Sequence, residues 1–143
     1  MNNFRDRERT LFERMRERLV NTLEFSEDQF SKWDCIDHTN ELIMELKCRD
    51  KKYRRDYQDF LIERNKWEAL RQTADELGYK PLYVNEHEGD IWIYDLSRVQ
   101  EPRWKELKCN AHTHFHAKGG EQITKEVGFL TWGQAARMYK NFI

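Results

Sequence analysis

The nine residues 41–49 constrain the fold of this chain more than any other stretch, because their character alternates along the chain. Glu45 and Lys47 fall on one side of the stretch. The apolar residues of the other side are Leu42, Met44, Leu46 and Cys48. A period of two is that of a β-strand, whose successive side chains point to opposite faces of a sheet. We therefore expect a strand over 41–49 with one buried face.

Length and composition limit the class of protein. A chain of 143 residues is long enough for one domain with a modest single core. Hydrophobic residues make up 38% of the chain and charged residues 36%, and the formal net charge is −1. This balance excludes a basic field over the whole surface, so binding to a nucleic acid would have to use local basic patches.

The three cysteines and the N-terminus indicate the compartment. The cysteines are odd in number and form no CxxC motif, which argues against a disulfide scaffold and for a reducing environment. Cys35 and Cys48 are expected to be small buried hydrophobic residues. The first residues show no apolar signal-peptide core, and no apolar run approaches the roughly 20 residues of a membrane span. We expect a soluble cytoplasmic protein.

Hydrophobic spacing predicts two long helices. Apolar residues recur at helical spacing over 4–24 and again over 62–77, where Gly78 follows as the expected C-terminal cap. These helices should flank a mixed central β-sheet, so the expected fold class is α/β, more narrowly α+β. The other expected elements of this single domain, 1–143, are strands over 32–37 and 111–117, a hairpin over 80–96, and a final helix from Thr131 to about Phe142, which begins with a capping-box pattern.

The hairpin that ends in the alternating strand brings charged residues together. If its loop is 38–41, Asp37 lies opposite Leu42 and Asp34 lies opposite Glu45. Directly opposed residues share a face and lie about 5 Å apart, and Lys47 follows one step along. Two carboxylates and a lysine can hold a divalent cation and activate water. Because a slip of one residue would change the pairing, Asp37 stays open as an alternative ligand.

Two further acids and one lysine have helical positions that could face this group. Glu8 falls inside the apolar stripe of the first helix, so it either points inward or reaches solvent from the start of the helix. Glu63 lies on the inner stripe of the second helix, one turn before Trp67, and Lys66 lies at the edge of that stripe. The other interpretation of this pair is a capping or surface pair, since acids are favoured in a first helical turn.

The segment after the alternating strand is strongly basic. Residues 47–55 contain six lysines and arginines against one acid. Such a segment can grip phosphates, and its tyrosine and Tyr57 could stack on bases; a solvated charged loop is the alternative. The candidate substrate contacts in it are Arg49, Lys51, Lys52 and Tyr53.

A second constellation lies near the C-terminus. Cys109, His112, His114 and His116 place three imidazoles on one face of the expected strand, and HxH is a known metal-ligand spacing. The outer two histidines would span about 13 Å along a strand, so two of them could share an ion but not all three. The segment could be a polar strand face, a nucleic-acid-contacting edge or a zinc site.

Trp33-Asp34, ten intervening residues and Glu45-Leu46-Lys47 together resemble the D…(D/E)xK motif of the PD-(D/E)XK phosphodiesterase superfamily. The resemblance covers 4–96, and it implies a restriction-endonuclease-like core with the element order αβββαβ, to which 97–143 would be a peripheral addition. Trp33 stands where the family motif has proline, and the QxxxY motif of the exonuclease branch is absent. A small endonuclease of the phage or mobile-element type is the closer likeness.

The resemblance implies a mechanism. Asp34 and Glu45 would bind Mg²⁺ or Mn²⁺, with Glu8 acting through a water, and Lys47 would orient the attacking water or stabilise the phosphate. Glu63 and Lys66 would supply a supporting acid and a phosphate contact.

Three functions follow as hypotheses from the residues and the resemblance. The first is a Mg²⁺-dependent DNA endonuclease, and cleavage of both strands by so small a domain would call for a homodimer. The second is a nucleic-acid-binding module without catalysis, and the third is a zinc protein built on the histidine segment. The sequence does not distinguish DNA from RNA.

Overall fold

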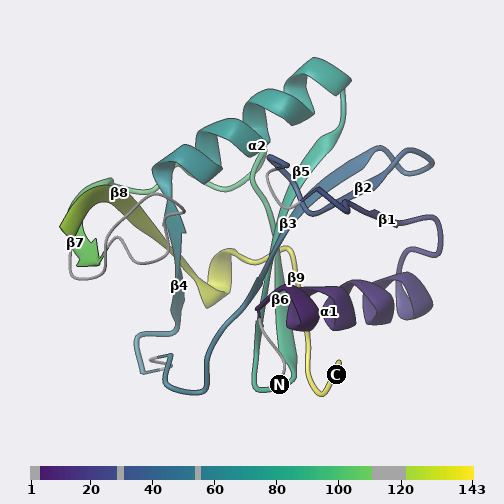
Figure 1. Cartoon of the computed structure of the whole chain (residues 1–143), viewed down its shortest axis with the longest axis horizontal. Helices are drawn as coiled ribbons and strands as arrows, with labels where there is room; N and C mark the ends of the chain where they lie inside the picture. The colour runs from purple at the N-terminus through teal and green to yellow at the C-terminus, as the bar shows by residue number, and fades with distance from the viewer. Residues whose placement is uncertain (1–3, 29–30, 54–55, 111–121) are drawn as a thin grey trace.

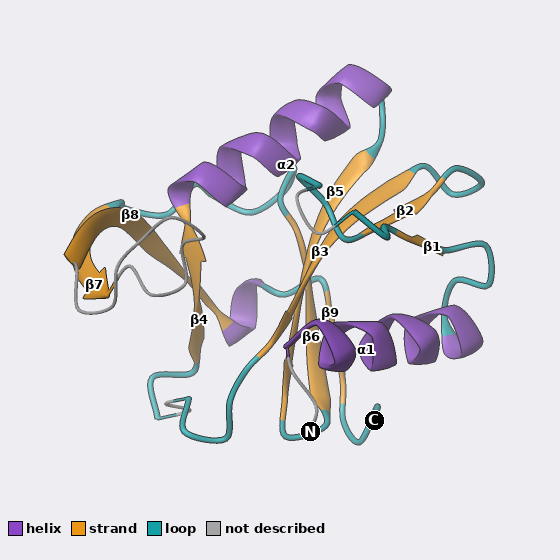
Figure 2. Cartoon of the chain, viewed as in Figure 1, coloured by secondary structure: helices purple, strands orange, loops and turns teal. Residues whose placement is uncertain are grey.

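The computed structural model describes residues 4–28, 31–53, 56–110 and 122–143. Within these residues the chain forms two α-helices, a six-stranded sheet and a three-stranded sheet (Figure 2). The helices are α1 (Phe4–Arg18) and α2 (Arg64–Leu77). The larger sheet has the strand order β1 (Glu24–Phe25), β2 (Cys35–Asp37), β3 (Leu42–Cys48), β5 (Lys80–His87), β6 (Asp90–Asp95) and β9 (Arg137–Tyr139). The smaller sheet has the order β4 (Asp59–Glu63), β8 (Gln122–Thr131) and β7 (Lys105–Asn110).

The larger sheet is mixed. Strands β1, β2 and β3 pair antiparallel as a meander, whereas β3 and β5 pair parallel. A parallel pair needs a crossover connection, and α2 lies within it. The elements α1, β1, β2, β3, α2 and β5 therefore follow one another in the αβββαβ order, with β4 inserted before α2 as a strand of the second sheet. The predicted fold class, a mixed sheet flanked by helices, is confirmed.

Both faces of β3 are buried, so the expectation of a single buried face was wrong. Met44 and Leu46 pack toward α1, whereas Ile43 packs with Trp67 and Leu70 of α2. Figure 1 shows the two helices on opposite sides of the sheet. A strand in the parallel part of a sheet is commonly covered on both faces. The charged side of β3 consequently lies in a covered layer and not in bulk solvent.

The sequence correctly predicted one helix cap and one hairpin turn. The cap after α2 is Gly78, whose φ of 72° is left-handed, a conformation that glycine adopts without the steric cost of a Cβ. The predicted hairpin over 80–96 forms as β5 and β6, and its turn residues Glu88 and Gly89 both have positive φ. Helix α1 ends at Arg18, six residues before its expected end.

The C-terminal third differs most from the expectation. The capping box at Thr131 forms, but it caps a single 3₁₀ turn, η2 (Trp132–Gln134), and not the expected helix. The chain then pairs with β6 as strand β9, where Met138 lies opposite Trp92. The open edge of β6 offers backbone hydrogen bonds that a separate helix could not make, which explains the error. The strand expected over 111–117 lies outside the described residues.

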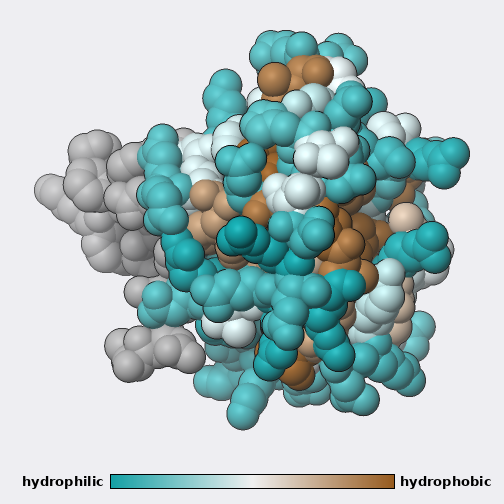
Figure 3. Space-filling view, turned by 90° about the vertical axis from the view of Figure 1, so that its right-hand side faces the viewer, coloured by the Kyte–Doolittle hydropathy of each residue, from teal (hydrophilic) through white to brown (hydrophobic). Residues whose placement is uncertain are grey.

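The smaller sheet shares a core with α2. Phe60 and Ile62 of β4 and Leu130 of β8 pack in the same buried cluster as Trp67. Strands β4 and β7 were not predicted; β4 is short, and its pairing partner, β8, is distant in sequence. The face shown in Figure 3 is largely hydrophilic, and hydrophobic residues reach it mainly in its central part. In the part of the chain described, neither helix has the length and apolar character needed to cross a membrane.

Candidate active site

The hairpin register that was predicted for β2 and β3 is the observed one. Asp37 pairs with Leu42, Ile36 with Ile43 and Cys35 with Met44, and Asp34 directly precedes the paired strand. The backbone N–H of Asp34 donates to the Met44 carbonyl at 2.8 Å. Its carboxylate Oδ2 accepts from the Leu46 N–H at 2.7 Å. Asp34 is therefore hydrogen-bonded to the residues on either side of Glu45.

Glu45 is buried next to two other acidic residues, Asp34 and Glu8. Its side chain is buried, with a relative exposure of 7% for the residue. Burial raises the pKa of Glu45 to about 8, and the negative charges of Asp34 and, less strongly, Glu8 act in the same direction, while Lys66 and Lys47 oppose them. Two carboxylates that share one site disfavour each other's ionised form. Additional positive charge at this place would therefore stabilise the ionised pair.

Two lysines come to the same place from different elements. Lys47 follows Glu45 on the same face of β3, since residues two apart on a strand share a face. Lys66, in the first turn of α2, places its Nζ 3.7 Å from Glu45 Oε1. Glu8 of α1 also contributes to the potential at Glu45. The structure thus assembles around Glu45 the charged residues that the sequence suggested, from three separate elements.

The sequence placed Glu63 inside the second helix, but the residue lies at the end of β4. It precedes α2 in extended conformation and makes no side-chain capping hydrogen bond. Its Oε1 is 2.6 Å from Nζ of Lys125, a residue of β8. Burial acts to raise the pKa of Glu63, but the hydrogen bond and charge of Lys125, together with Lys47 and Lys66, lower it overall. Glu63 is therefore an ionised acid that fixes a lysine beside the group around Glu45.

Sequence reasoning missed Lys125. It lies in a strand that was not predicted, and it reaches the site only because β8 pairs with β4. No spacing along the chain connects it to the motif residues, so only the sheet topology could have identified it.

Asp37, the alternative metal ligand, is hydrogen-bonded to residues in and near the hairpin turn. Its carboxylate accepts hydrogen bonds from the Thr22 hydroxyl at 2.6 Å, the Asn40 amide at 2.6 Å and the Thr39 N–H at 3.1 Å. Burial acts to raise the pKa of Asp37, but these hydrogen bonds lower it overall. The residue has a structural explanation and lies at the turn end of the hairpin, away from Glu45.

Arg49 does not point outward with the basic segment. Its Nε donates to Asn85 Oδ1 at 2.8 Å, and its NH2 group donates to the Leu61 carbonyl at 2.6 Å. Its guanidinium also lies 4.8 Å from the centre of the Tyr53 ring. Arg49 thus joins β5 to β4, and its guanidinium is hydrogen-bonded within the protein.

The rest of the basic segment divides between core and surface. Tyr53 stacks on Phe60 with ring centres 5.7 Å apart, and its hydroxyl accepts from the Leu61 N–H, so its ring is occupied within the protein. Lys51 and Lys52 are exposed, and Tyr57 is 61% exposed. In the described part of this stretch, the exposed candidates for contact with a nucleic acid are therefore Lys51, Lys52 and Tyr57.

The described residues contain no ready cluster of three or more histidine, cysteine or acidic side chains around one point. The donor set at the candidate centre is the pair Asp34 and Glu45, with Glu8 acting at longer range. Mg²⁺ keeps several of its waters and is commonly held by one or two carboxylates, so this donor set fits it. The segment with His112, His114 and His116, and the side chain of Cys109, lie outside the described residues.

Comparison with known proteins adds one distant likeness. No family model and no curated protein matches this chain. Among solved structures it is similar to the 1.6 Å structure of Hjc, a Holliday junction resolvase from the archaeal hyperthermophile Archaeoglobus fulgidus. The TM-score is 0.46 and the sequence identity 16%, over 66% of this chain and 77% of the Hjc chain.

The central hairpin and the residue before it carry the motif residues. Asp34 is hydrogen-bonded to β3 on either side of Glu45, and α2 returns the chain to β5, which pairs with β3. The element order expected from the resemblance, αβββαβ, is the observed one, with β4 inserted before α2.

Proposed function

We propose that this protein is a Mg²⁺-dependent endonuclease that hydrolyses DNA. The observation that supports the proposal is the grouping around Glu45: Asp34 is hydrogen-bonded to Met44 and Leu46 on either side of it, Lys66 Nζ lies 3.7 Å from its Oε1, and Lys47 acts on its charge. In an enclosed site, converging carboxylates and lysines are the groups that metal-assisted phosphodiester hydrolysis requires.

Each residue has a task in this reaction. Asp34 and Glu45 would hold the metal, with Glu8 supporting it through water, and a bound Mg²⁺ supplies positive charge and a water of lowered pKa. Lys47 orients the attacking water and stabilises the charge that develops on the phosphate. Lys66 is paired with Glu45 in the metal-free protein, and it contacts a phosphate oxygen once Glu45 is otherwise neutralised.

The surface next to the site supplies contacts to the DNA backbone. Lys51 and Lys52 are exposed on the segment that leaves β3, and contacts between lysines and phosphates supply affinity that does not depend on sequence. Cutting both strands of a duplex would use two copies of the site, one in each protomer of a homodimer.

Plasmid cleavage with Mg²⁺ tests the proposal directly. Wild type is compared with Glu45→Ala and Lys47→Ala, and with the matched controls Glu13→Ala and Lys140→Ala, which change exposed residues far along the chain. We expect cleavage by wild type and both controls and a loss of activity in both site variants. Undiminished cleavage in both site variants would remove the proposed centre, and salt-sensitive DNA binding without cleavage under any divalent ion would leave a binding module.

A further inference from the structure

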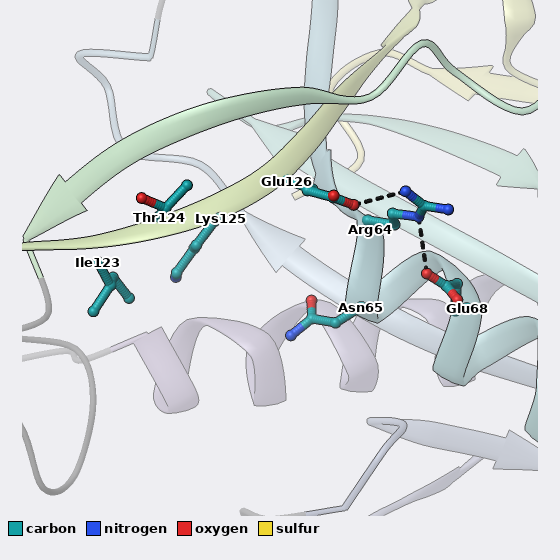
Figure 4. A pocket seen from close by; sticks show the side chains of 7 residues that line it. All are labelled: Arg64, Asn65, Glu68, Ile123, Thr124, Lys125 and Glu126. Carbon is teal, nitrogen blue, oxygen red and sulfur yellow. Dashed lines mark hydrogen bonds and ion pairs between the residues drawn. The ribbon is translucent and has the colours of Figure 1, made fainter.

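A cleft of about 460 Å³ opens between the first turns of α2 and strand β8 (Figure 4). Arg64, Asn65 and Glu68 line it from α2, and residues 123–126 line it from β8. The volume is within the range of clefts that bind small molecules. None of the functions assigned above uses this cleft.

One wall of the cleft is formed by Arg64, whose positive charge is paired with two carboxylates. Arg64 Nε lies 3.0 Å from Glu68 Oε1, and its NH1 group lies 2.8 Å from Glu126 Oε2, as Figure 4 shows. The same guanidinium lies 5.8 Å from the centre of a Trp104 ring. Because two carboxylates offset its charge, Arg64 forms a wall and not a free anion site.

Apart from Lys125, the remaining lining consists of two uncharged polar residues and one apolar residue. Asn65 and Thr124 are exposed, and within the described part of the chain neither side chain has a hydrogen-bond partner. The amide and the hydroxyl each offer a donor and an acceptor, and Ile123 lies beside them as a half-buried apolar surface. A planar ring with hydrogen-bonding edges, such as a nucleobase, matches this set better than a bare phosphate does.

Lys125 connects the cleft to the candidate centre. It lines the cleft, and its Nζ lies 2.6 Å from Glu63 Oε1. Glu63 in turn lies within the electrostatic reach of Lys47 and Lys66, and Asn65 is the chain neighbour of Lys66. A strand whose phosphate is at Glu45 would therefore place an adjoining nucleotide at Lys125.

We propose that the cleft binds one unpaired nucleotide next to the phosphate that is cleaved, so that the substrate is a nucleic acid with unpaired residues at the cutting site. Lys125 contacts the phosphate of this nucleotide, Ile123 packs against its base, and Asn65 and Thr124 bind the edge of the base. A base becomes available to such side chains when it is unstacked and unpaired. This inference deepens the proposed nuclease function and rests on it for the position of the cleaved phosphate.

Binding of mononucleotides to the metal-free protein tests the cleft without cleavage. Wild type labelled with ¹⁵N is titrated separately with dAMP, dCMP, dGMP, TMP and 2-deoxyribose 5-phosphate. We expect at least one nucleotide to shift the Asn65 side-chain amide and the backbone amides of 123–125. The sugar phosphate, which lacks a base, should bind about fivefold more weakly or worse. Equal binding of the sugar phosphate, or no shifts at these positions, would overturn the proposal.

Two variants, each of which removes an exposed side-chain amide, test whether the cleft also affects cleavage. Asn65→Ala should weaken binding of the preferred nucleotide and lower cleavage of an oligonucleotide duplex with an unpaired segment relative to a fully paired duplex. Gln72→Ala, which removes an exposed amide further along the same helix, should change neither. An unchanged preference in Asn65→Ala would contradict the inference.

The two proposals fail in different ways. Nucleotide-dependent shifts in a protein that cleaves nothing would support the cleft and reject the nuclease. Cleavage by wild type without nucleotide binding at 123–125 would support the nuclease and reject the cleft.

Discussion

The two ends of the β2–β3 hairpin contain aspartates three residues apart that have opposite environments. At the turn end, Asp37 is fully buried, yet it accepts hydrogen bonds from Thr22, Thr39 and Asn40, and its pKa is lowered overall. At the other end, Asp34 is hydrogen-bonded to the residues on either side of Glu45, whose pKa is raised by burial and by the charge of Asp34.

The comparison shows that burial alone does not indicate a functional acid. A buried carboxylate whose hydrogen bonds are supplied by its own turn stabilises the fold. At Glu45 the second carboxylate and burial together outweigh the nearby lysines, so the pKa is raised and the pair is suited to bind a cation. The number of donors around each acid separates the two roles, although both residues belong to one short hairpin.

The same substitution at the two aspartates should produce the largest contrast. Asp34→Asn removes one proposed metal ligand, and we expect the rate of plasmid cleavage to fall on the order of a thousandfold. Asp37→Asn should leave the rate per folded molecule within about twofold of wild type, because Asp37 does not face Glu45. Rates are measured under single-turnover conditions, and equal losses in both variants would erase the distinction between the two ends.

Removal of the turn carboxylate should instead affect stability. Asp37→Ala leaves several donors without an acceptor in a buried place, so we expect the free energy of unfolding to fall by about 3 kcal/mol. Urea denaturation at pH 7 measures this change, and Glu24→Ala, at an exposed position of β1, is its control. A loss no larger than that of the control would show that the turn does not depend on Asp37.

The pH dependence of stability should differ between the acids. The folded-state pKa of Glu45 is about 8, above the ordinary glutamate value of 4.5, so between these values the folded state binds more protons than the unfolded state. Its contribution is fully present below pH 4.5 and is lost as pH rises toward 8, with a limiting slope of about 1.4 kcal/mol per pH unit. The contribution of Asp37, whose pKa is lowered, is lost instead as pH falls below about 4.

Glu45→Gln tests the predicted loss of stability as pH rises. Denaturation of the metal-free variant between pH 5.5 and 7.5 should show a flatter dependence of the unfolding free energy than wild type. Added Mg²⁺ should also stabilise wild type at pH 8 more than it stabilises the variant, since a ligand stabilises the state that binds it. Identical pH curves for the two proteins would mean that Glu45 is not the residue responsible.

The smallest expected effect concerns the basic segment. Lys51→Ala with Lys52→Ala should weaken DNA binding a few-fold and reduce the slope of log K against log salt by up to about two. Arg49→Met should leave that slope unchanged and lower the unfolding free energy instead, because its guanidinium is hydrogen-bonded to Asn85 and the Leu61 carbonyl. Fluorescence anisotropy at several salt concentrations distinguishes the two, and a salt slope that changes only in Arg49→Met would reverse the assignment.

Local pattern was sufficient for the parts of the fold that depend on neighbouring residues. The alternation over 41–49 and the turn residues before it predicted the strand, the hairpin and the pairing register. Helical spacing predicted α2, and Gly78 predicted its end. These features depend on residues within a few positions of one another, so the information for them is contiguous in the chain.

The sequence by itself therefore determined which acids lie close together, since hairpin register follows from turn position and from the period of the strand. Only the tertiary structure decided what surrounds them. Burial of the second face of β3, the inward position of Arg49 and the arrival of Lys125 all depend on α2 and the second sheet. The pairing partners of β4 and β8 in that sheet are more than 60 residues apart, and no local period encodes a contact over that distance.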